Sequence, residues 1–161
     1  MDIIHYGLLI ALAIALVIAA ITDIRSRRIE NRLNAAIALG APVFWWASGM
    51  AFWPDVVIQI GFALVVFAAF AALFATGMLG GGDVKLLGAL ALWLTPLAFL
   101  NLLLIMALVG GVMAVWFIIR RMVFKPDTPG KLPYGVAITI GGLWVLSVTY
   151  LPDVALASAA G

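Results

Sequence analysis

Two aspartates lie beside long apolar segments, where an ionised carboxylate is energetically unfavourable. Asp23 follows an apolar run from Ile3 to Ile21, and Asp83 follows three glycines in the segment Gly80-Gly81-Gly82-Asp83-Val84-Lys85. Because the apolar run is long enough to cross a bilayer, both acids are expected near the edge of a membrane. A carboxylate there must be hydrated, paired or used, so both are candidate functional residues.

Two carboxyl groups placed together can act as an acid and a base. Both cannot easily ionise, so such a pair holds one proton and its members take opposite roles. The ionised member removes a proton from water while the protonated member donates to a peptide carbonyl, which gives a tetrahedral intermediate without an acyl-enzyme. This is aspartic-protease chemistry. The pair titrates as a unit, and the sequence assigns the proton to neither Asp23 nor Asp83.

The three glycines suit the same chemistry. Gly80, Gly81 and Gly82 are expected to give the backbone beside Asp83 conformations closed to other residues and to let another chain approach closely. A peptide must be extended to be cut, and irregular backbone facing a cavity can pair with it at membrane depth. The plainer alternative is a tight interhelical turn with a solvated Asp83, and for Asp23 a surface pair with Arg27 worth about 0–1 kcal/mol.

The composition identifies the kind of element that must position these acids. The chain is 66% hydrophobic and 10% charged over 161 residues, against about 45–50% and about 25% in a soluble domain. We therefore expect an all-α membrane helix bundle, forming one domain over residues 1–161, with membrane lipid around it. Cysteine is absent, which excludes disulfides and Cys-ligated zinc. No nucleic-acid-binding motif is present, so no nucleic-acid partner is expected.

Apolar segments of roughly 20 residues mark the spans. The sequence predicts about six transmembrane helices, with the fourth ended or kinked at Thr95-Pro96. Their expected ranges are Ile3–Thr22, Leu33–Trp53, Val56–Met78, a helix starting near Val84, a helix from Leu97 or Asn101 to Ile119, and Tyr134–Leu151.

The basic residues predict the orientation. With six spans all nine Lys and Arg fall on one side, and Asp2, Asp55 and Asp153 fall on the other. Because positive loops stay in the cytoplasm, both termini are expected outside. This topology puts Asp23 and Asp83 at the same depth on the cytoplasmic side, joined by an out-and-back pair of helices, so the two can be neighbours.

Three elements together resemble the type IV prepilin peptidases, a family of membrane aspartic peptidases. Gly80-Gly81-Gly82-Asp83-Val84-Lys85 is similar to the GxGD element of that family with its following Lys. Asp23, ahead of Ile29-Glu30-Asn31, is similar to the first catalytic Asp, and Leu132-Pro133-Tyr134-Gly135 resembles a late proline-aromatic-glycine element.

The resemblance implies that Asp23 and Asp83 are the catalytic pair, with Gly80, Gly82 and Lys85 as a supporting loop. It also implies an active-site rim formed by Asn31, Pro133, Tyr134 and Gly135. The implied activity is removal of the short basic leader of a prepilin, ahead of its hydrophobic helix, at the cytoplasmic face of the bacterial inner membrane. The small size is most similar to peptidases of tight-adherence (Flp) pili, which makes pilus assembly machinery a further expected partner. Larger members also methylate the new N-terminus through a cysteine-bearing insertion that is not seen here, so methylation is not expected.

The chain departs from the family at Glu30, where a proline is usual. Without that proline the turn must be held otherwise, and Asn31 is expected to cap the following helix. For Lys85, contact with substrate carbonyls or the acid pair and a simple role in orientation remain equally open.

No cofactor and no metal are expected. A hard cation needs several oxygen ligands, and Glu30 and Asp127 are the only further acids on the predicted cytoplasmic side. Two alternatives to a peptidase remain: a small proton-coupled transporter using the same two Asp, or a non-catalytic pilus assembly protein. Transporter acids are expected near the midplane of the membrane rather than at one surface.

Overall fold

The computed structural model describes residues 3–124 and 133–159, and this part of the chain is helical without strands. The prediction of an all-α bundle is confirmed, and six α-helices correspond to the six predicted transmembrane segments, although not all of them have the length and apolarity of a membrane span. The helices are α1 (Ile3–Ser26), α2 (Asn31–Ala47), a short π-helical turn η1 (Phe52–Val56), α3 (Val57–Ala75), α4 (Gly81–Ala91), α5 (Pro96–Phe124) and α6 (Tyr134–Ala159).

Length separates the helices into two kinds. In the described part three helical stretches are long and apolar enough to cross a membrane: Ile3–Ser26, Phe52–Ala75 and Pro96–Val123. By contrast α4 has 11 residues, about 16 Å at about 1.5 Å per residue, against about 30 Å of hydrocarbon. The chain is therefore an integral membrane protein in which one short helix lies among longer ones.

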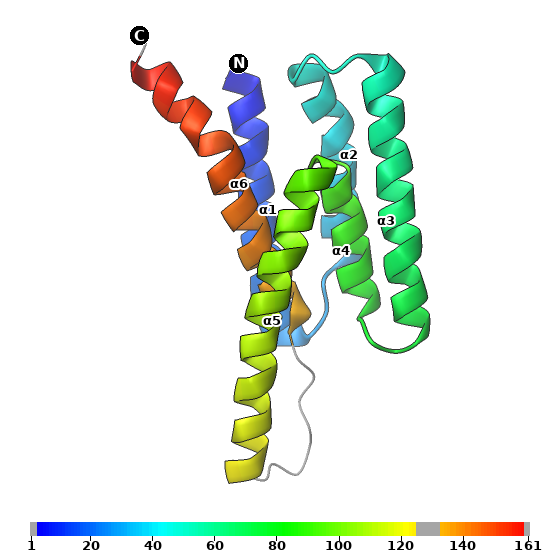
Figure 1. Ribbon diagram of the computed structural model, residues 1–161, viewed down its shortest axis with the longest axis vertical. Helices are drawn as coiled ribbons and strands as arrows, with labels where there is room; N and C mark the ends of the chain where they lie inside the picture. The colour runs from blue at the N-terminus through cyan, green and yellow to red at the C-terminus, as the bar shows by residue number, and fades with distance from the viewer. Residues whose placement is uncertain (1–2, 125–132, 160–161) are drawn as a thin grey trace.

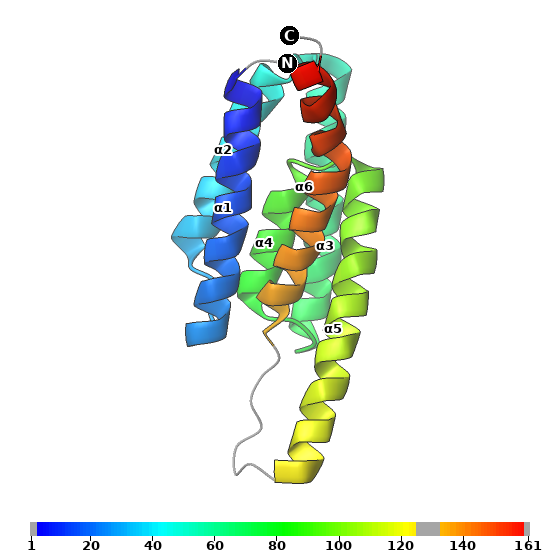
Figure 2. The same cartoon turned by 90° about the vertical axis from the view of Figure 1, so that its left-hand side faces the viewer.

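The short helix α4 lies at the centre of the bundle. It packs against α2, α3, α5 and α6, whereas α1 packs on α2 and α6, and α5 packs mainly on α6. Figure 1 shows α4 between α5 and α3, and Figure 2 shows α1 and α6 covering it from the other side. Every residue of α4 from Leu86 to Ala91 is buried. The second half of this helix is thus enclosed by its neighbours, whereas its first turn is only partly buried.

The second predicted helix ends early in the structure, whereas the predicted break after the fourth is present. The predicted helix Leu33–Trp53 ends at Ala47, because the chain turns at Gly49 with φ of 68° and then enters η1. A positive φ is natural for glycine and stops the helix there. The break at Thr95-Pro96 occurs as predicted, since Pro96 opens α5, where its missing N–H costs nothing, and the Thr95 hydroxyl accepts a hydrogen bond from Ala98 N at 3.3 Å.

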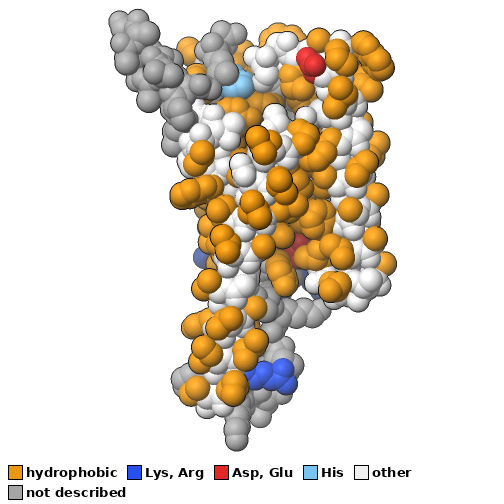
Figure 3. Space-filling view, in the orientation of Figure 1, with side chains coloured by type: hydrophobic (Ala, Val, Ile, Leu, Met, Phe, Trp, Pro, Cys, Tyr) orange, Lys and Arg blue, Asp and Glu red, His pale blue; other side chains and the backbone are white. Residues whose placement is uncertain are grey.

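Charge is segregated to one end of the bundle. The end of α1, the α1–α2 loop, the starts of α2 and α4 and the end of α5 are all directed to the lower side of Figure 1, where α5 extends furthest, and all Lys and Arg of the described residues belong to these segments. Figure 3 shows blue side chains only in the lower half of an otherwise mostly apolar face. Asp55 lies at the opposite end, ahead of α3. The side chains of Asp2, Lys125, Asp127, Lys131 and Asp153 lie outside what the structure describes.

Candidate functional site

A cavity of about 910 Å³ opens at the basic end of the bundle. Its lining comes from the end of α1, the α1–α2 loop, the α3–α4 turn and the start of α6. Both aspartates line it, together with Glu30, Asn31, the glycines at the start of α4 and Tyr134. The cavity thus gathers most of the predicted site residues from four separate parts of the chain.

Asp23 lies in the last turns of α1 and is only 6% exposed. Its Oδ2 accepts a hydrogen bond from the backbone N–H of Gly135 at 2.8 Å, and the positive charge of Arg27 acts on it from the next turn. Asp23 is thus covered by protein rather than lying on the outer surface, although it lines the cavity together with Arg27. A buried carboxylate with one backbone donor and a nearby cation is held in a fixed position.

Gly135 reaches Asp23 because it has no side chain. A Cβ added at Gly135 would lie 2.8 Å from Oδ2 and 3.0 Å from Cγ of Asp23. The first turn of α6 therefore lies directly against the carboxylate, and only glycine fits there without displacing it.

Asp83 is half-buried in the first turn of α4, where a carboxylate is favoured by the helix dipole. The backbone N–H of Gly80 donates a hydrogen bond to its carboxylate, and the charge of Asp23 acts on it. The two acids are close enough to repel each other when both are ionised. The structure thus brings together, from α1 and α4, the two acids that the sequence singled out.

The glycines before Asp83 serve close approach rather than unusual backbone angles. Gly80 has φ of −77° and ψ of 143°, and Gly81 and Gly82 are already helical, so the expectation of conformations closed to other residues is wrong for this segment. The turn takes its positive φ of 78° at Gly77 instead. A Cβ at Gly82 would lie 3.2 Å from Cβ of Ile29, so the absence of a side chain lets the α1–α2 loop pack on α4.

Lys85 ties α4 to α2 rather than pointing at the acids. Its Nζ donates a hydrogen bond to Oδ1 of Asn31 at 2.8 Å. Asn31 is the first residue of α2 and Glu30 holds the N-cap position without a side-chain cap bond, so the predicted cap by Asn31 is wrong. The pairing with Lys85 places Asn31 at the cavity wall.

Asn34 is a site residue that the sequence analysis missed. It is 4% exposed, and its Nδ2 donates to the carbonyl oxygen of Gly82 at 3.3 Å, next to Asp83. Its signal in the sequence was the spacing from Asn31, since residues three apart lie on the same face of a helix.

The other predicted rim residues stand near the same place. Pro133 is buried just ahead of α6, and Tyr134 is half-buried and lines the cavity, while Leu132 lies outside the described residues. Within the described ranges no three His, Asp or Glu are grouped so as to hold a metal ion, although Glu30 lines the cavity with the two aspartates.

Fold and site together define a class: a helical integral membrane protein with two interacting carboxylates in a cavity at its basic end. Comparison with known proteins gives the family. The model of the type IV leader peptidase family matches residues 10–115, a range that contains Asp23 and Asp83. The chain belongs to this family.

Relatives with curated names agree with this assignment. The chain is 33% identical over 143 residues, 86% of its length, to a prepilin leader peptidase/N-methyltransferase of Pectobacterium carotovorum subsp. carotovorum, covering 50% of that protein. It is 30% identical over 154 residues, 89% of its length, to the protein of the same name in Aeromonas hydrophila, covering 52% of it. The chain thus spans about half the length of these curated relatives. No solved structure matches it significantly.

Proposed function

We propose that this chain is an aspartic endopeptidase that removes the leader peptide of type IV prepilins. The observation that carries the proposal is the meeting of Asp23 and Asp83 in one cavity, on helices α1 and α4 that the chain brings together from separate segments. The relatives are named as prepilin leader peptidases, and the paired acids supply the chemistry that such a reaction needs.

In the proposed reaction the two acids share one proton. The ionised carboxylate takes a proton from a water in the cavity, and that water attacks the scissile carbonyl carbon. The protonated carboxyl group donates its proton to the carbonyl oxygen, so a neutral tetrahedral intermediate forms. Its collapse breaks the C–N bond as the nitrogen leaves with a proton, and the products are a new carboxyl end and a new amino end.

The surroundings of the pair suit an extended substrate. The Gly80–Gly82 segment presents backbone without side chains to the cavity beside Asp83. Glu30 lines the same cavity and is exposed, so it offers a negative charge to a basic leader, while Arg27 and Arg28 repel one. Glu30 is thus the residue we propose to offset the basic surroundings.

We further propose that the reaction takes place at the cytoplasmic face of the bacterial inner membrane. Support comes from the basic residues at the end of the bundle that holds the acids, because positive segments stay in the cytoplasm. Flp-type prepilins are the proposed substrates, by the resemblance in size, and no methylation step is included in the proposal.

Substitution of either acid tests the proposal. Asp23→Asn and Asp83→Asn are each expected to lower leader removal from a co-expressed prepilin by about 10²–10⁴-fold or more, because each removes one partner of the acid–base pair. The measurement is the shift of the prepilin band on a gel, with the level of the variant in the membrane checked in parallel. Asp55→Asn, at the other end of the bundle, is the matched control and is expected to process normally.

Two outcomes would contradict this function. Normal processing by Asp23→Asn or Asp83→Asn would remove the catalytic assignment. Ion or solute flux through the purified protein in liposomes, lost on the same substitutions and seen without any proteolysis, would favour the transporter instead.

A further inference from the structure

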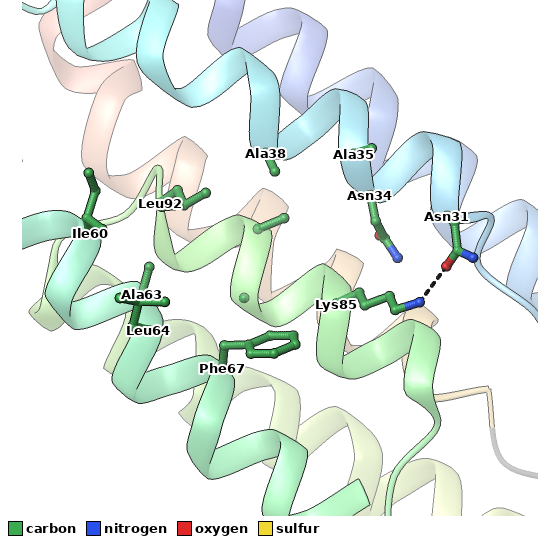
Figure 4. A pocket seen from close by; sticks show the side chains of 12 residues that line it. Asn31, Asn34, Ala35, Ala38, Ile60, Ala63, Leu64, Phe67, Lys85 and Leu92 are labelled. Atoms are coloured by element: carbon green, nitrogen blue, oxygen red, sulfur yellow. Dashed lines mark hydrogen bonds between the residues drawn. The ribbon is translucent and has the colours of Figure 1, made fainter.

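A second hollow, about 430 Å³ in volume, runs between α2, α3 and α4. Helices α2 and α3 each pack on α4 and hardly on each other, so α4 forms the floor of an open groove (Figure 4). Apart from one polar end, its lining is aliphatic or aromatic. We call it the α2–α3 groove.

The walls of the α2–α3 groove suit a helix as occupant. Ala35 and Ala38 on α2 present only small side chains, and small residues let another helix approach closely in a membrane. On α3, Leu64 is 63% exposed and Phe67 is 44% exposed along the groove. The ring of Phe67 packs over Gly88, where an added Cβ would lie 2.8 Å from it, and the exposed parts of both side chains offer apolar contact to an occupant of the groove.

The groove is continuous with the cavity of the two aspartates. Asn31 lines both, and its hydrogen bond with Lys85 marks the junction (Figure 4). Asn34, which holds the carbonyl of Gly82 beside Asp83, also lines the groove at this end. From the junction the groove runs along α4 past Gly88 toward Leu92, away from the acids.

The other described apolar hollow lacks this connection. It has a volume of about 460 Å³ and is lined by residues of α1 and α6 such as Tyr6, Ile10 and Tyr150. None of its lining residues lines the cavity of the aspartates. Of the two, only the α2–α3 groove can guide a chain from the membrane to the acids.

We propose that the α2–α3 groove receives the transmembrane helix of the substrate, with its amino end at Asn31 and the preceding extended segment across Asp23 and Asp83. The inference rests on the proposed function, in which the bond to be cut lies just ahead of an apolar helix. Such a helix stays in the membrane during cleavage, so it needs an apolar binding site that opens beside the acids. The groove satisfies both conditions.

Disulfide cross-linking tests directly whether the substrate helix binds in the α2–α3 groove, because the chain has no cysteine of its own. Ala38→Cys and Leu64→Cys are made in the Asp83→Asn background and paired with a prepilin that carries one cysteine at successive positions of its apolar helix. The matched controls are Ala36→Cys and Val65→Cys, which neighbour the groove residues in sequence, are exposed and do not line the groove. Cross-links at Ala38 and Leu64 with a helical period along the substrate, and none at the controls, are expected.

A substitution that fills the groove tests the same binding site through the rate of prepilin cleavage. Ala38→Phe is expected to lower kcat/KM for the full prepilin at least tenfold, whereas Ala36→Phe is expected to stay within about twofold of the unchanged chain. Membrane levels of both variants are compared first. If Ala38→Phe fails to accumulate, the bulkier but less buried change Leu64→Trp replaces it, with Val65→Trp as its control.

The outcomes separate this inference from the function on which it rests. Absence of cleavage by the unchanged chain would contradict the proposed function, whereas the cross-links are read without cleavage. Equal cross-linking at groove and control positions, or none at any of them, would contradict binding of the substrate helix in the α2–α3 groove. Normal kcat/KM with the groove filled would also contradict this inference and would indicate that the groove contacts lipid chains instead.

Discussion

At the scale of single residues, the site depends on contacts that leave no room for a side chain. Gly135 donates its N–H to Asp23 Oδ2 at 2.8 Å, and a Cβ added at Gly80 would lie 2.8 Å from Asp83 Oδ2. Each acid is thus held by the backbone of a glycine from another segment or the preceding turn. Because such contacts leave no slack, a single methyl group is expected to misplace a carboxylate.

Replacement of Gly135 by alanine tests this contact. The added Cβ would push Asp23 away and break its backbone hydrogen bond, so we expect Gly135→Ala to lower the prepilin processing rate at least tenfold, equivalent to about 1.4 kcal/mol in the barrier. The measurement is processing in membranes at matched protein levels. Gly111→Ala is the control, because a Cβ there meets no atom within 4 Å. Equal activity of the two variants would show that the contact does not position Asp23.

At the scale of elements, α4 sets the geometry because it is short and buried. Its carboxyl end stops inside the bundle, where the last carbonyl groups cannot turn to water. Side chains from neighbouring helices satisfy them instead. Gln59 of α3 donates from Nε2 to the carbonyl oxygens of Ala91 and Leu94, each at 2.7 Å, and Trp45 of α2 donates from Nε1 to that of Leu92 at 2.8 Å.

Replacement of Gln59 by leucine is expected to destabilise the bundle. The change keeps the size of the side chain but leaves two buried carbonyl groups unpaired, at a cost of about 1–3 kcal/mol in the free energy of unfolding. Unfolding in mixed detergent micelles measures it. Thr76→Val is the control, because the Thr76 hydroxyl bonds only within its own exposed turn, and a change within about 0.5 kcal/mol is expected there. If the free energy of unfolding falls no more for Gln59→Leu than for Thr76→Val, these carbonyl groups find other hydrogen-bond partners.

At the scale of the whole molecule, two features of the bundle act together. Opposite ends differ in charge, since all described Lys and Arg lie at the end with the cavity and Asp55 lies at the other. The lateral surface is apolar on the face seen in Figure 3. Because basic segments tend to stay in the cytoplasm, we expect the side of the membrane on which the cavity opens to be set by the basic residues around the acids.

Labelling of single cysteines tests this orientation in the cysteine-free chain. We expect Phe52→Cys, at the acidic end, to react with a membrane-impermeant maleimide added to intact cells. Arg28→Cys and Met78→Cys, at the cavity end, are expected to react only after the cells are opened, because we propose that the basic end faces the cytoplasm. Phe52 and Met78 are 78% and 67% exposed, so poor access does not account for a difference. The reverse pattern would place the cavity outside the cell.

The sequence by itself determined the class of fold and the candidate acids. The backbone of long apolar segments can be satisfied in lipid only as helices, so the order of the helices followed from hydropathy, with the break expected at Thr95-Pro96 present ahead of α5. The segregation of basic residues followed from the same count of spans. Asp23 and Asp83 stood out because an acid at the end of an apolar segment is rare enough to be noticed in the sequence alone.

Only the tertiary structure decided how the acids are held and what lies beside them. The short reach of α4, the approach of Gly135 to Asp23 and the role of Asn34 depend on contacts between residues far apart in the chain. The expected cap by Asn31 is wrong because α2 begins at Asn31 with Glu30 in the N-cap position, and the side-chain oxygen of Asn31 accepts from Lys85 of α4. Local patterns carry the periodicity of one helix, whereas the groove and the cavity arise where several helices meet, and the packing of side chains between helices decides their shape.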